Sequence, residues 1–393
     1  MPTVTGPITT SANAPVVALD YTPAYEQGGG IGRYVRELVA ALARIDARTS
    51  YRLFVSGAAP GALPPLPGDN FSWRATRLTP RNLARVWHRA RLPLPVEVFT
   101  GAVDLYHAAD FVLPPHLPSA RTLLTVHDLS FVQVPETASP PLKAYLDAVV
   151  PRSVRRADHI LADSDATRID LINLYGLPPE KITVLLSGVD SRFKPARADE
   201  IASVRQKYGL DGVEFLLAVG TVQPRKNYAR LAQALARLRQ RGYDLHLVVA
   251  GGAGWLEDPI HQAVRAAGME QFVHFIGFAP DADLPALYSA ACCLAFPSLY
   301  EGFGLPVLEA MACGTPVVTS NLSSLPEVAA DAALLVDPYD VEALAWALER
   351  VVSDTDLRRR LVSQGTTRAA HFTWEASARH LLAVYSQLLS RAP

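Results

Sequence analysis

Short apolar segments with strand character alternate with helix-period segments along the whole chain, and this alternation restricts the fold more than any other feature. The predicted strands are 16–19, 51–55, 104–106, 122–126, 160–162, 182–185, then 215–219, 245–250, 273–276, 294–296, 317–319 and 333–336. Amphipathic helices are predicted at 34–45, 227–241, 341–352 and 375–390. Such alternation produces parallel sheets with right-handed crossovers. Two series of similar length predict an α/β fold with two Rossmann-like domains rather than one large sheet.

The joint between the two series is predicted at Gly188–Pro195, where the segment GVDSRFKP combines a turn glycine with a terminating proline. This division predicts a first domain at 1–190, a second domain at 191–372 and a C-terminal helix at 373–393 that packs back toward the first domain. Open α/β sheets bind ligands at the carboxyl ends of their strands. We therefore expect the ligand to lie in the cleft between the two domains.

Composition excludes several classes of protein. The formal net charge of the 393 residues is −1, which argues against a general role in binding nucleic acid. The cysteines Cys292, Cys293 and Cys313 have no metal-ligand spacing and show no disulfide pattern. The first dozen residues have no signal-peptide pattern and are expected to form a disordered tail. Because no apolar run of membrane-spanning length occurs either, a soluble cytoplasmic protein is predicted.

The segment SLYEGFGLPVLEAMACGTPVV, which follows the strand at 294–296, carries the strongest motif. Glu301 and Glu309 flank two glycines and Pro306, a residue suited to the first turn of a helix. A helix N-terminus after a strand favours an anion, and carboxylates on either side can accept hydrogen bonds from sugar hydroxyls. The two glutamates alone could also be an ordinary loop charge and a helix-surface residue. The glycines, the proline and the strand favour a nucleotide-sugar site instead.

A second motif, VGTVQPRKNYARLAQAL, begins at a strand end and runs into a helix. Arg225 and Lys226 fall at the start of this helix, directed across the strand ends. Together they can neutralise a diphosphate, since arginine offers a planar fork of donors and lysine a point charge. A solvated pair of surface cations is the alternative.

Taken together, the two motifs resemble those of the retaining glycosyltransferases of family 4, which have the two-domain GT-B architecture. The resemblance extends to GGGIGRYVRELVAAL, TVHDLSFVQVPE, the ADS and GVD turns, and FTWEASARHLLAVY, and so covers most of the chain. It implies that Glu309 holds the ribose hydroxyls of the donor and that Glu301 contacts the transferred sugar. It also implies that Lys226 binds the diphosphate with help from Arg225. Thr221 stands where many relatives have an arginine, which leaves the division of roles open.

The resemblance also assigns residues of the first domain. Gly29 and Gly30 match the Gly-Gly turn that approaches the donor phosphates, and Arg33 breaks the alternative dinucleotide fingerprint. His127 matches the family histidine near the reacting carbon, and Asp128 either orients its ring or caps the next turn. The catalytic residues are then expected to be His127, Glu301, Lys226 and Arg225. The donor-binding residues are expected to be Gly29, Gly30, Gly220, Thr221, Arg225, Lys226, Phe278, Ala279, Glu301, Gly302, Phe303, Gly304, Leu305 and Glu309.

No metal and no other cofactor is expected. Two Asp-x-Asp sequences, Asp281 to Asp283 and Asp163 to Asp165, imitate a metal motif, but each precedes a helix and is interpreted as a cap. The paired cations can supply the charge that Mg²⁺ would bring. Family members retain the anomeric configuration, so the resemblance implies front-face transfer in which a donor phosphate oxygen takes the acceptor proton.

The expected activity is transfer of a hexose from a nucleotide-diphosphate sugar to a glycan or lipid-linked acceptor in bacterial polysaccharide synthesis. The first-domain motifs favour GDP-mannose over UDP-glucose. A nucleotide-sugar epimerase of the same fold and a catalytically silent carbohydrate-binding protein are the alternatives. Asn70–Val96 contains six arginines and no acidic residue, and an apolar stripe over 83–90 predicts one amphipathic helix. This helix could contact an anionic membrane at the inner face of the cell, or be a domain helix with a solvated basic face.

Overall fold

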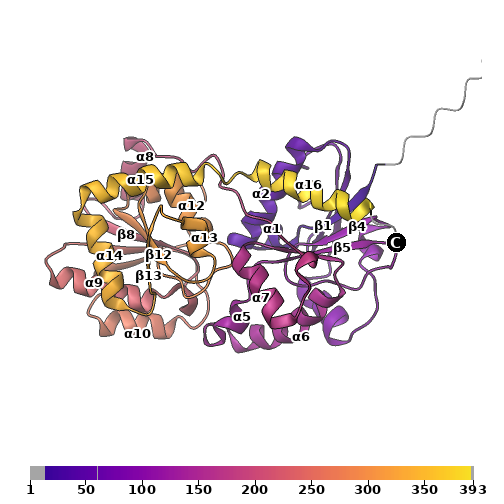
Figure 1. Ribbon diagram of the computed structural model, residues 1–393, viewed down its shortest axis with the longest axis horizontal. Helices are drawn as coiled ribbons and strands as arrows, with labels where there is room; N and C mark the ends of the chain where they lie inside the picture. Colours follow the sequence, from indigo (N-terminus) through magenta and orange to yellow (C-terminus); the bar gives the residue numbers. More distant parts are fainter. Residues whose placement is uncertain (1–13, 60, 391–393) are drawn as a thin grey trace, which may run out of the picture.

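The structure, a computed structural model, describes residues 14–59 and 61–390. The expected N-terminal tail lies outside these residues. The described chain forms two lobes that lie side by side (Figure 1). Each lobe contains one sheet in which every described strand pairing is parallel. The predicted α/β architecture of two Rossmann-like domains is confirmed.

The first sheet has the strand order β3-β2-β1-β4-β5-β6-β7. Its strands are β1 (Val16–Asp20), β2 (Ser50–Ser56), β3 (Phe71–Thr76), β4 (Leu105–Ala108), β5 (Arg121–Val126), β6 (His159–Ala162) and β7 (Ile182–Val184). Its helices are α1 (Thr22–Glu26), α2 (Gly30–Ile45), α3 (Pro80–Ala84), α4 (Glu97–Thr100), α5 (Ser130–Gln133), α6 (Pro140–Arg156) and α7 (Asp165–Tyr175). The order changes direction at β1, which places the loops after β1 and β4 at the switch point of the sheet.

The second sheet has the strand order β10-β9-β8-β11-β12-β13. Its strands are β8 (Phe215–Val219), β9 (His246–Ala250), β10 (Val273–Gly277), β11 (Cys293–Phe296), β12 (Val317–Ser320) and β13 (Leu334–Val336). Its helices are α8 (Ala198–Lys207), α9 (Tyr228–Gln240), α10 (Asp258–Ala266), α11 (Leu284–Ala290), α12 (Leu305–Ala312), α13 (Leu325–Ala329), α14 (Val341–Ser353) and α15 (Thr355–Ala369). The central strands β8 and β11 are buried along their whole length, as expected of strands covered on both faces.

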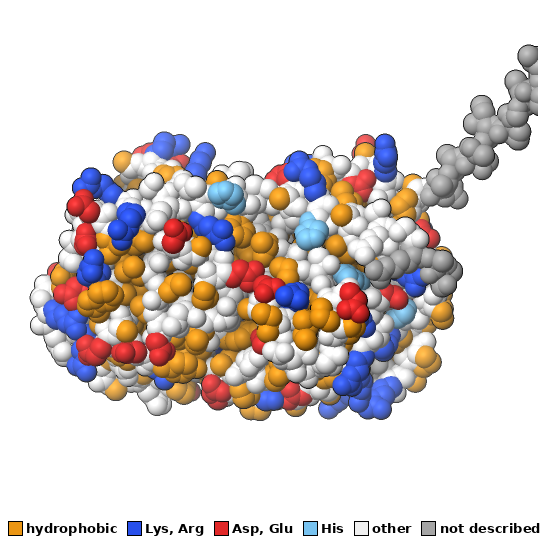
Figure 2. Space-filling view, in the orientation of Figure 1, with side chains coloured by type: hydrophobic (Ala, Val, Ile, Leu, Met, Phe, Trp, Pro, Cys, Tyr) orange, Lys and Arg blue, Asp and Glu red, His pale blue; other side chains and the backbone are white. Residues whose placement is uncertain are grey.

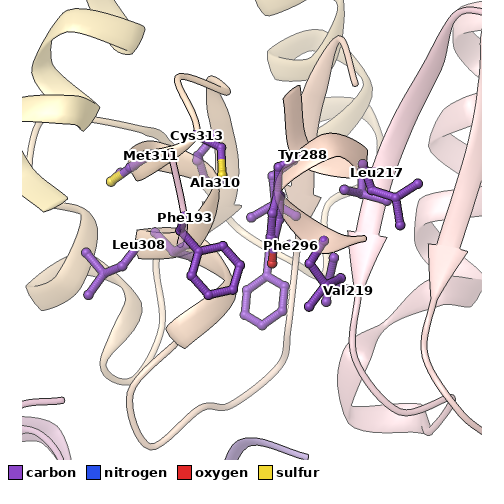
Figure 3. Close-up of a cluster of buried hydrophobic side chains, with 14 of the residues drawn as sticks. Phe193, Leu217, Val219, Tyr288, Phe296, Leu308, Ala310, Met311 and Cys313 are labelled. Carbon is purple, nitrogen blue, oxygen red and sulfur yellow. The ribbon is translucent and has the colours of Figure 1, made fainter. Parts of the chain in front are cut away.

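Hydrophobic cores lie on the two faces of each sheet. Figure 3 shows part of one core of the second domain, which includes Leu308 of α12 and Tyr288 of α11. Phe193, from the segment that joins the domains, packs into the same core. The helix that carries Glu309 is therefore anchored by buried apolar side chains, each of which contributes roughly 1.5–3 kcal/mol when fully buried.

The chain crosses between the lobes twice. The first crossing lies between β7 and α8, and the second leads into α16 (Trp374–Ser390), which returns to the first lobe beside α2 (Figure 1). Trp374, Leu381 and Tyr385 of α16 are buried in the first-domain core. The two crossings are joined by a hydrogen bond of 3.0 Å from the Val189 amide to the Phe372 carbonyl. They form a narrow connection between the lobes.

The amphipathic helix predicted over 83–90 within Asn70–Val96 is confirmed in part, because the chain is helical from Pro80 to Arg89. This segment begins with the edge strand β3, continues through α3 and ends in a π-helical turn, Arg85–Arg89. Leu83 is buried and Trp87 packs against the first-domain core, so these members of the expected stripe face the protein. Arg81, Arg85 and Arg89 are exposed. The apolar spacing does mark one face of a helix, but this face packs against the core of its own domain.

Candidate functional site

A cavity of about 480 Å³ lies between the lobes, at the carboxyl ends of both sets of strands. Every residue predicted to bind the donor or to act in catalysis lines this one cavity. Its walls come from the starts of α2 and α12 and from the loops after β5, β8, β10 and β11. The structure therefore brings together residues that are up to 280 positions apart in the chain (Gly29 to Glu309, 309 − 29). Their individual roles stay predictions.

Glu301 lies in the loop after β11 and is almost completely buried. Its carboxylate accepts from Lys226 Nζ at 2.6 Å and forms an ion pair of 2.8 Å with Arg225. Burial would raise the pKa of Glu301, but the two cations outweigh it and lower the pKa to about 2. Glu301 is consequently ionised at every physiological pH. The Arg225 guanidinium also donates to the Tyr300 carbonyl at 2.6 Å, which fixes its plane.

Glu309 lies in the second turn of α12, and its side chain is 2% exposed. The helix begins after Gly304, whose φ of 111° is a conformation that favours glycine. One carboxylate oxygen of Glu309 accepts from the Tyr288 hydroxyl at 2.8 Å. The other accepts from Arg33, which belongs to the first domain. The predicted ribose-binding carboxylate is thus held in place from both sides of the cleft.

His127 follows β5 and is buried, with both ring nitrogens engaged. Nδ1 lies 2.8 Å from Asp163 Oδ2, and Nε2 lies 2.9 Å from the Ala109 carbonyl oxygen. Since a carboxylate and a carbonyl can only accept, both nitrogens must donate and the ring is an imidazolium. Burial alone would lower the pKa of His127, but the ion pair with Asp163 outweighs it and raises the pKa to about 9. His127 and Asp163 therefore form a buried ion pair in the cavity wall.

Asp128 was expected either to orient the His127 ring or to cap the next turn, and the structure supports the capping role. Its carboxylate accepts from the Ser130 amide at 2.9 Å, whereas Asp163 orients the His127 ring. The cap interpretation of Asp163 was wrong, because Ser164 is the residue that caps α7. The sequence does contain a signal for this pair. His127 directly follows one predicted strand, and Asp163 directly follows the next predicted strand along the chain. Adjacent parallel strands bring their terminal residues together at one edge of the sheet.

The other Asp-x-Asp sequence, Asp281 to Asp283, does place Asp283 at the N-cap position of α11, as interpreted. Asp283 makes no capping hydrogen bond there; its carboxylate accepts from Lys207 and Tyr208, each at 2.6 Å. Asp281 pairs with Arg33 across the cleft. Arg33 itself was considered only as the residue that breaks a dinucleotide pattern. Nothing in the local sequence indicates its long-range partners.

Three buried polar atoms in the cavity wall have no hydrogen-bond partner within residues 14–59 and 61–390: Arg33 Nε, Asp163 Oδ1 and Gln223 Oε1. Buried polar groups in folded proteins are nearly always paired, and an unpaired one costs about 1–3 kcal/mol. Such atoms gathered in one cavity are typical of a site that a polar ligand completes. A donor and two acceptors suit a ligand rich in hydroxyl groups.

Gly29 and Gly30 form the turn that precedes and begins α2. A Cβ added at either glycine would have no atom within 4 Å, so protein packing does not require glycine at these positions. Backbone left uncovered at a helix N-terminus is suited to an anion. This observation is consistent with the predicted approach of the donor phosphates.

The two domains touch at the rim of the cavity. Trp255 Nε1 donates to the Thr137 carbonyl at 2.7 Å, and the Glu327 carboxylate accepts from the Asp165 amide at 2.9 Å. The lobes therefore contact each other directly through these two hydrogen bonds.

Within the described ranges, no group of three or more His, Cys, Asp or Glu side chains is placed to hold a metal ion. In the same ranges, no helix is both long and apolar enough to cross a membrane. On the face drawn in Figure 2, acidic and basic side chains are spread over both lobes.

Two Rossmann-like lobes that enclose a cavity lined by cations and by helix starts define the GT-B class of proteins. Family models match both halves of the chain: "Glycosyltransferase Family 4" over residues 28–193 and "Glycosyl transferases group 1" over residues 200–368. The O-antigen chain mannosyltransferase B of Escherichia coli is 34% identical over 373 residues, which cover 91% of this chain and 96% of that protein. The chain belongs to glycosyltransferase family 4.

Other relatives are more distant or shorter in overlap. A D-inositol 3-phosphate glycosyltransferase of Salinispora arenicola is 38% identical over 252 residues, 60% of this chain and 56% of that protein. Sucrose-phosphate synthase of Thermosynechococcus elongatus has a TM-score of 0.75 and 24% identity, covering 96% of this chain and all of the other. HepE of Anabaena, solved with UDP-glucose, has a TM-score of 0.71 and 19% identity, with coverages of 95% and 99%. These two structures support the fold.

Proposed function

We propose that the chain is a retaining, metal-independent hexosyltransferase that uses a nucleotide-diphosphate sugar. One observation carries the proposal: a single cavity between the domains is lined by Glu301, Glu309 and the cations Arg225 and Lys226. The leaving group of such a reaction is a nucleoside diphosphate, whose negative charge grows in the transition state. Preorganised positive charge at that position is the largest catalytic contribution to expect.

The residues divide the work by their chemistry. Lys226 and Arg225 stabilise the diphosphate, assisted by the backbone amides at the starts of α2 and α12. Glu309 accepts from the ribose hydroxyls, and Glu301 faces the transferred sugar while keeping the two cations in place. His127, as an imidazolium, donates hydrogen bonds and cannot act as a general base near pH 7. This arrangement is consistent with front-face transfer, in which a donor phosphate oxygen receives the acceptor proton.

We propose GDP-mannose as the donor in preference to UDP-glucose. The proposal is supported by the mannosyltransferase of Escherichia coli that matches nearly the whole chain. The acceptor we propose is a glycan or a lipid-linked glycan in the synthesis of a bacterial polysaccharide. We further propose a cytoplasmic location, which agrees with three cysteines that are all free in the structure.

The first domain supports a second proposal, peripheral contact with an anionic membrane. Arg81, Arg85 and Arg89 are exposed on a segment that has no acidic residue between Asn70 and Val96. Exposed Leu78 and Leu92 flank them. Basic side chains at an anionic surface contribute about 1 kcal/mol each, so this group could hold the enzyme near a lipid-linked acceptor.

Incubation with a panel of nucleotide sugars tests the proposed function. Release of the nucleoside diphosphate that rises when an acceptor extract is added indicates a transferase. A nucleotide-sugar epimerase would instead change the sugar without releasing the nucleotide. A silent carbohydrate-binding protein would do neither, and that result would contradict the proposal.

A further inference from the structure

Arg33 connects the two domains inside the cavity. It lies on α2, four positions after the helix-capping Gly29, and only 14% of its side chain is exposed. Its guanidinium pairs with two carboxylates of the second domain, Glu309 on α12 and Asp281 after β10. A guanidinium this buried is stable only when it is paired, and here both of its partners come from the opposite lobe.

The pairing of Arg33 is incomplete. Its Nε–H is buried and has no acceptor in the described part of the chain, although both terminal nitrogens are bonded. Because Arg33 lines the cavity beside Glu309, a small shift of its guanidinium would bring the covered Nε–H to a ligand of Glu309. A ribose hydroxyl can donate to a carboxylate and accept from an N–H at the same time. The pair Arg33 and Glu309 offers that combination.

The contact continues from the cavity to the connection between the lobes. Arg192, in the first crossing segment, pairs with Glu37 at 3.1 Å, with Asp190 at 3.0 Å and with Asp281 at 3.6 Å. Asp281 is therefore shared by Arg33 and Arg192. Glu37 lies one helical turn after Arg33 on α2, so both residues face the second domain. These ion pairs form one network from the ribose-binding carboxylate to this connection.

We propose that Arg33, on the first domain, contacts the nucleoside part of the donor together with Glu309. Binding of the donor then favours the closed arrangement of the two domains. The inference rests on the proposed function, because it takes a nucleoside diphosphate as the ligand. It follows that the second domain alone cannot bind the nucleoside with full affinity. Closure is stabilised because the ligand bonds to both lobes at once.

Calorimetry with GDP, UDP and inorganic pyrophosphate tests the proposal. Pyrophosphate can contact Arg225 and Lys226 but has no ribose. Arg33→Ala is expected to weaken binding of the preferred nucleoside diphosphate at least about 10-fold, as loss of a hydrogen bond involving a charged group would. Binding of pyrophosphate should change less than about 2-fold. Arg33→Lys keeps the charge without the fork and should bind with intermediate affinity.

Arg44→Ala is the matched control. Arg44 lies on the same helix and also forms an ion pair, with Glu375, but it is 52% exposed and outside the cavity. The Arg44→Ala variant should bind GDP, UDP and pyrophosphate with the same affinity as the unmodified protein. Small-angle scattering adds an independent readout. Addition of the nucleoside diphosphate should reduce the radius of gyration of the unmodified protein and of Arg44→Ala, and should reduce that of Arg33→Ala less.

The inference would be overturned if both Arg33 variants bound the nucleoside diphosphate as well as the unmodified protein does, or more tightly. Tighter binding would mean that Arg33 blocks the site. Equal weakening of nucleoside diphosphate and pyrophosphate would also overturn it, because it would indicate general damage to the cavity. If the unmodified protein bound no nucleoside diphosphate, the proposed function would fail and the inference with it. These outcomes are distinguishable.

Discussion

Gly302 of the second domain lies directly against the backbone of His127 in the first. A Cβ built at Gly302 would be 1.8 Å from the His127 carbonyl oxygen and 2.9 Å from the Asp128 Cβ. No side chain larger than hydrogen fits at this position while the lobes are closed. The glycine that follows Glu301 therefore sets how closely the domains can approach.

Replacement of Gly302 by alanine should hinder closure without unfolding either domain. Because reacting groups displaced by about 1 Å can lose about 10²-fold in rate, we expect kcat/KM to fall on the order of 10²-fold. Steady-state kinetics measures the loss, and the melting temperature should stay close to that of the unmodified protein. Normal turnover by the alanine variant would show that the closed arrangement is not the active one.

Lys226 and Glu309 should affect different kinetic constants. Lys226→Ala removes charge that meets the leaving group as it develops, so kcat should fall about 10²-fold or more. Glu309→Ala removes contacts that are similar in ground and transition states, and should mainly raise the KM for the donor. Initial rates over a range of donor concentrations separate the two effects. The opposite pattern would reverse the role assignment.

The titration of His127 should depend on Asp163. The pKa of His127 is raised from 6.5 to about 9, so its stabilising contribution is complete below pH 6.5 and is lost as the pH rises through about 9. Asp163→Asn removes the charge of the ion pair, and burial should then bring the pKa below 6.5. Imidazole resonances followed by NMR measure both midpoints. A midpoint near 6.5 in the unmodified protein would contradict the imidazolium assignment.

In thermal unfolding, the Asp163→Asn variant should lose stability most at pH 6 and least above pH 9. The loss at low pH is expected to be a few kcal/mol, since each pKa unit corresponds to about 1.4 kcal/mol. A loss that is the same at every pH would attribute the effect to packing instead.

Turnover should not require a divalent cation. Arg225 and Lys226 already place two positive charges beside the predicted diphosphate position. Rates measured with EDTA, with Mg²⁺ and with Mn²⁺ should agree within a factor of about 2, because the leaving-group charge is stabilised by side chains. Abolition by EDTA with recovery on added metal would disprove this.

Liposome co-sedimentation tests the basic segment. Binding is expected to require anionic lipid, to weaken in high salt and to fall when Arg81, Arg85 and Arg89 are changed to glutamate. A second triple variant, with Arg237, Arg265 and Arg359 of the second domain changed to glutamate, controls for net charge and should still bind. Indifference to lipid charge would leave the segment as a solvated basic face.

The sequence alone was sufficient for the architecture and for part of the cavity lining, whereas Arg33 and Asp163 were not predicted to belong to it. Buried parallel strands appear in the sequence as short apolar runs, and the segments that follow them contain Gly29, Lys226, Glu301 and Glu309 in recognisable motifs. The strand β3 was missed because its segment FSWRAT is polar on an edge of the sheet, where burial does not demand an apolar run. The helix over 83–90 was predicted with two alternative settings, because periodicity does not say what its apolar side will contact.

Only the tertiary structure decided which charges meet. Arg33 and Glu309 belong to different domains and are 276 positions apart, and no local pattern specifies this pair. Local sequence determines backbone conformation and burial through short-range sterics and periodicity. Pairing of charges across a cleft depends instead on how two separately folded domains are oriented, which the packing of α16 on α2 and the short connection between the lobes establish.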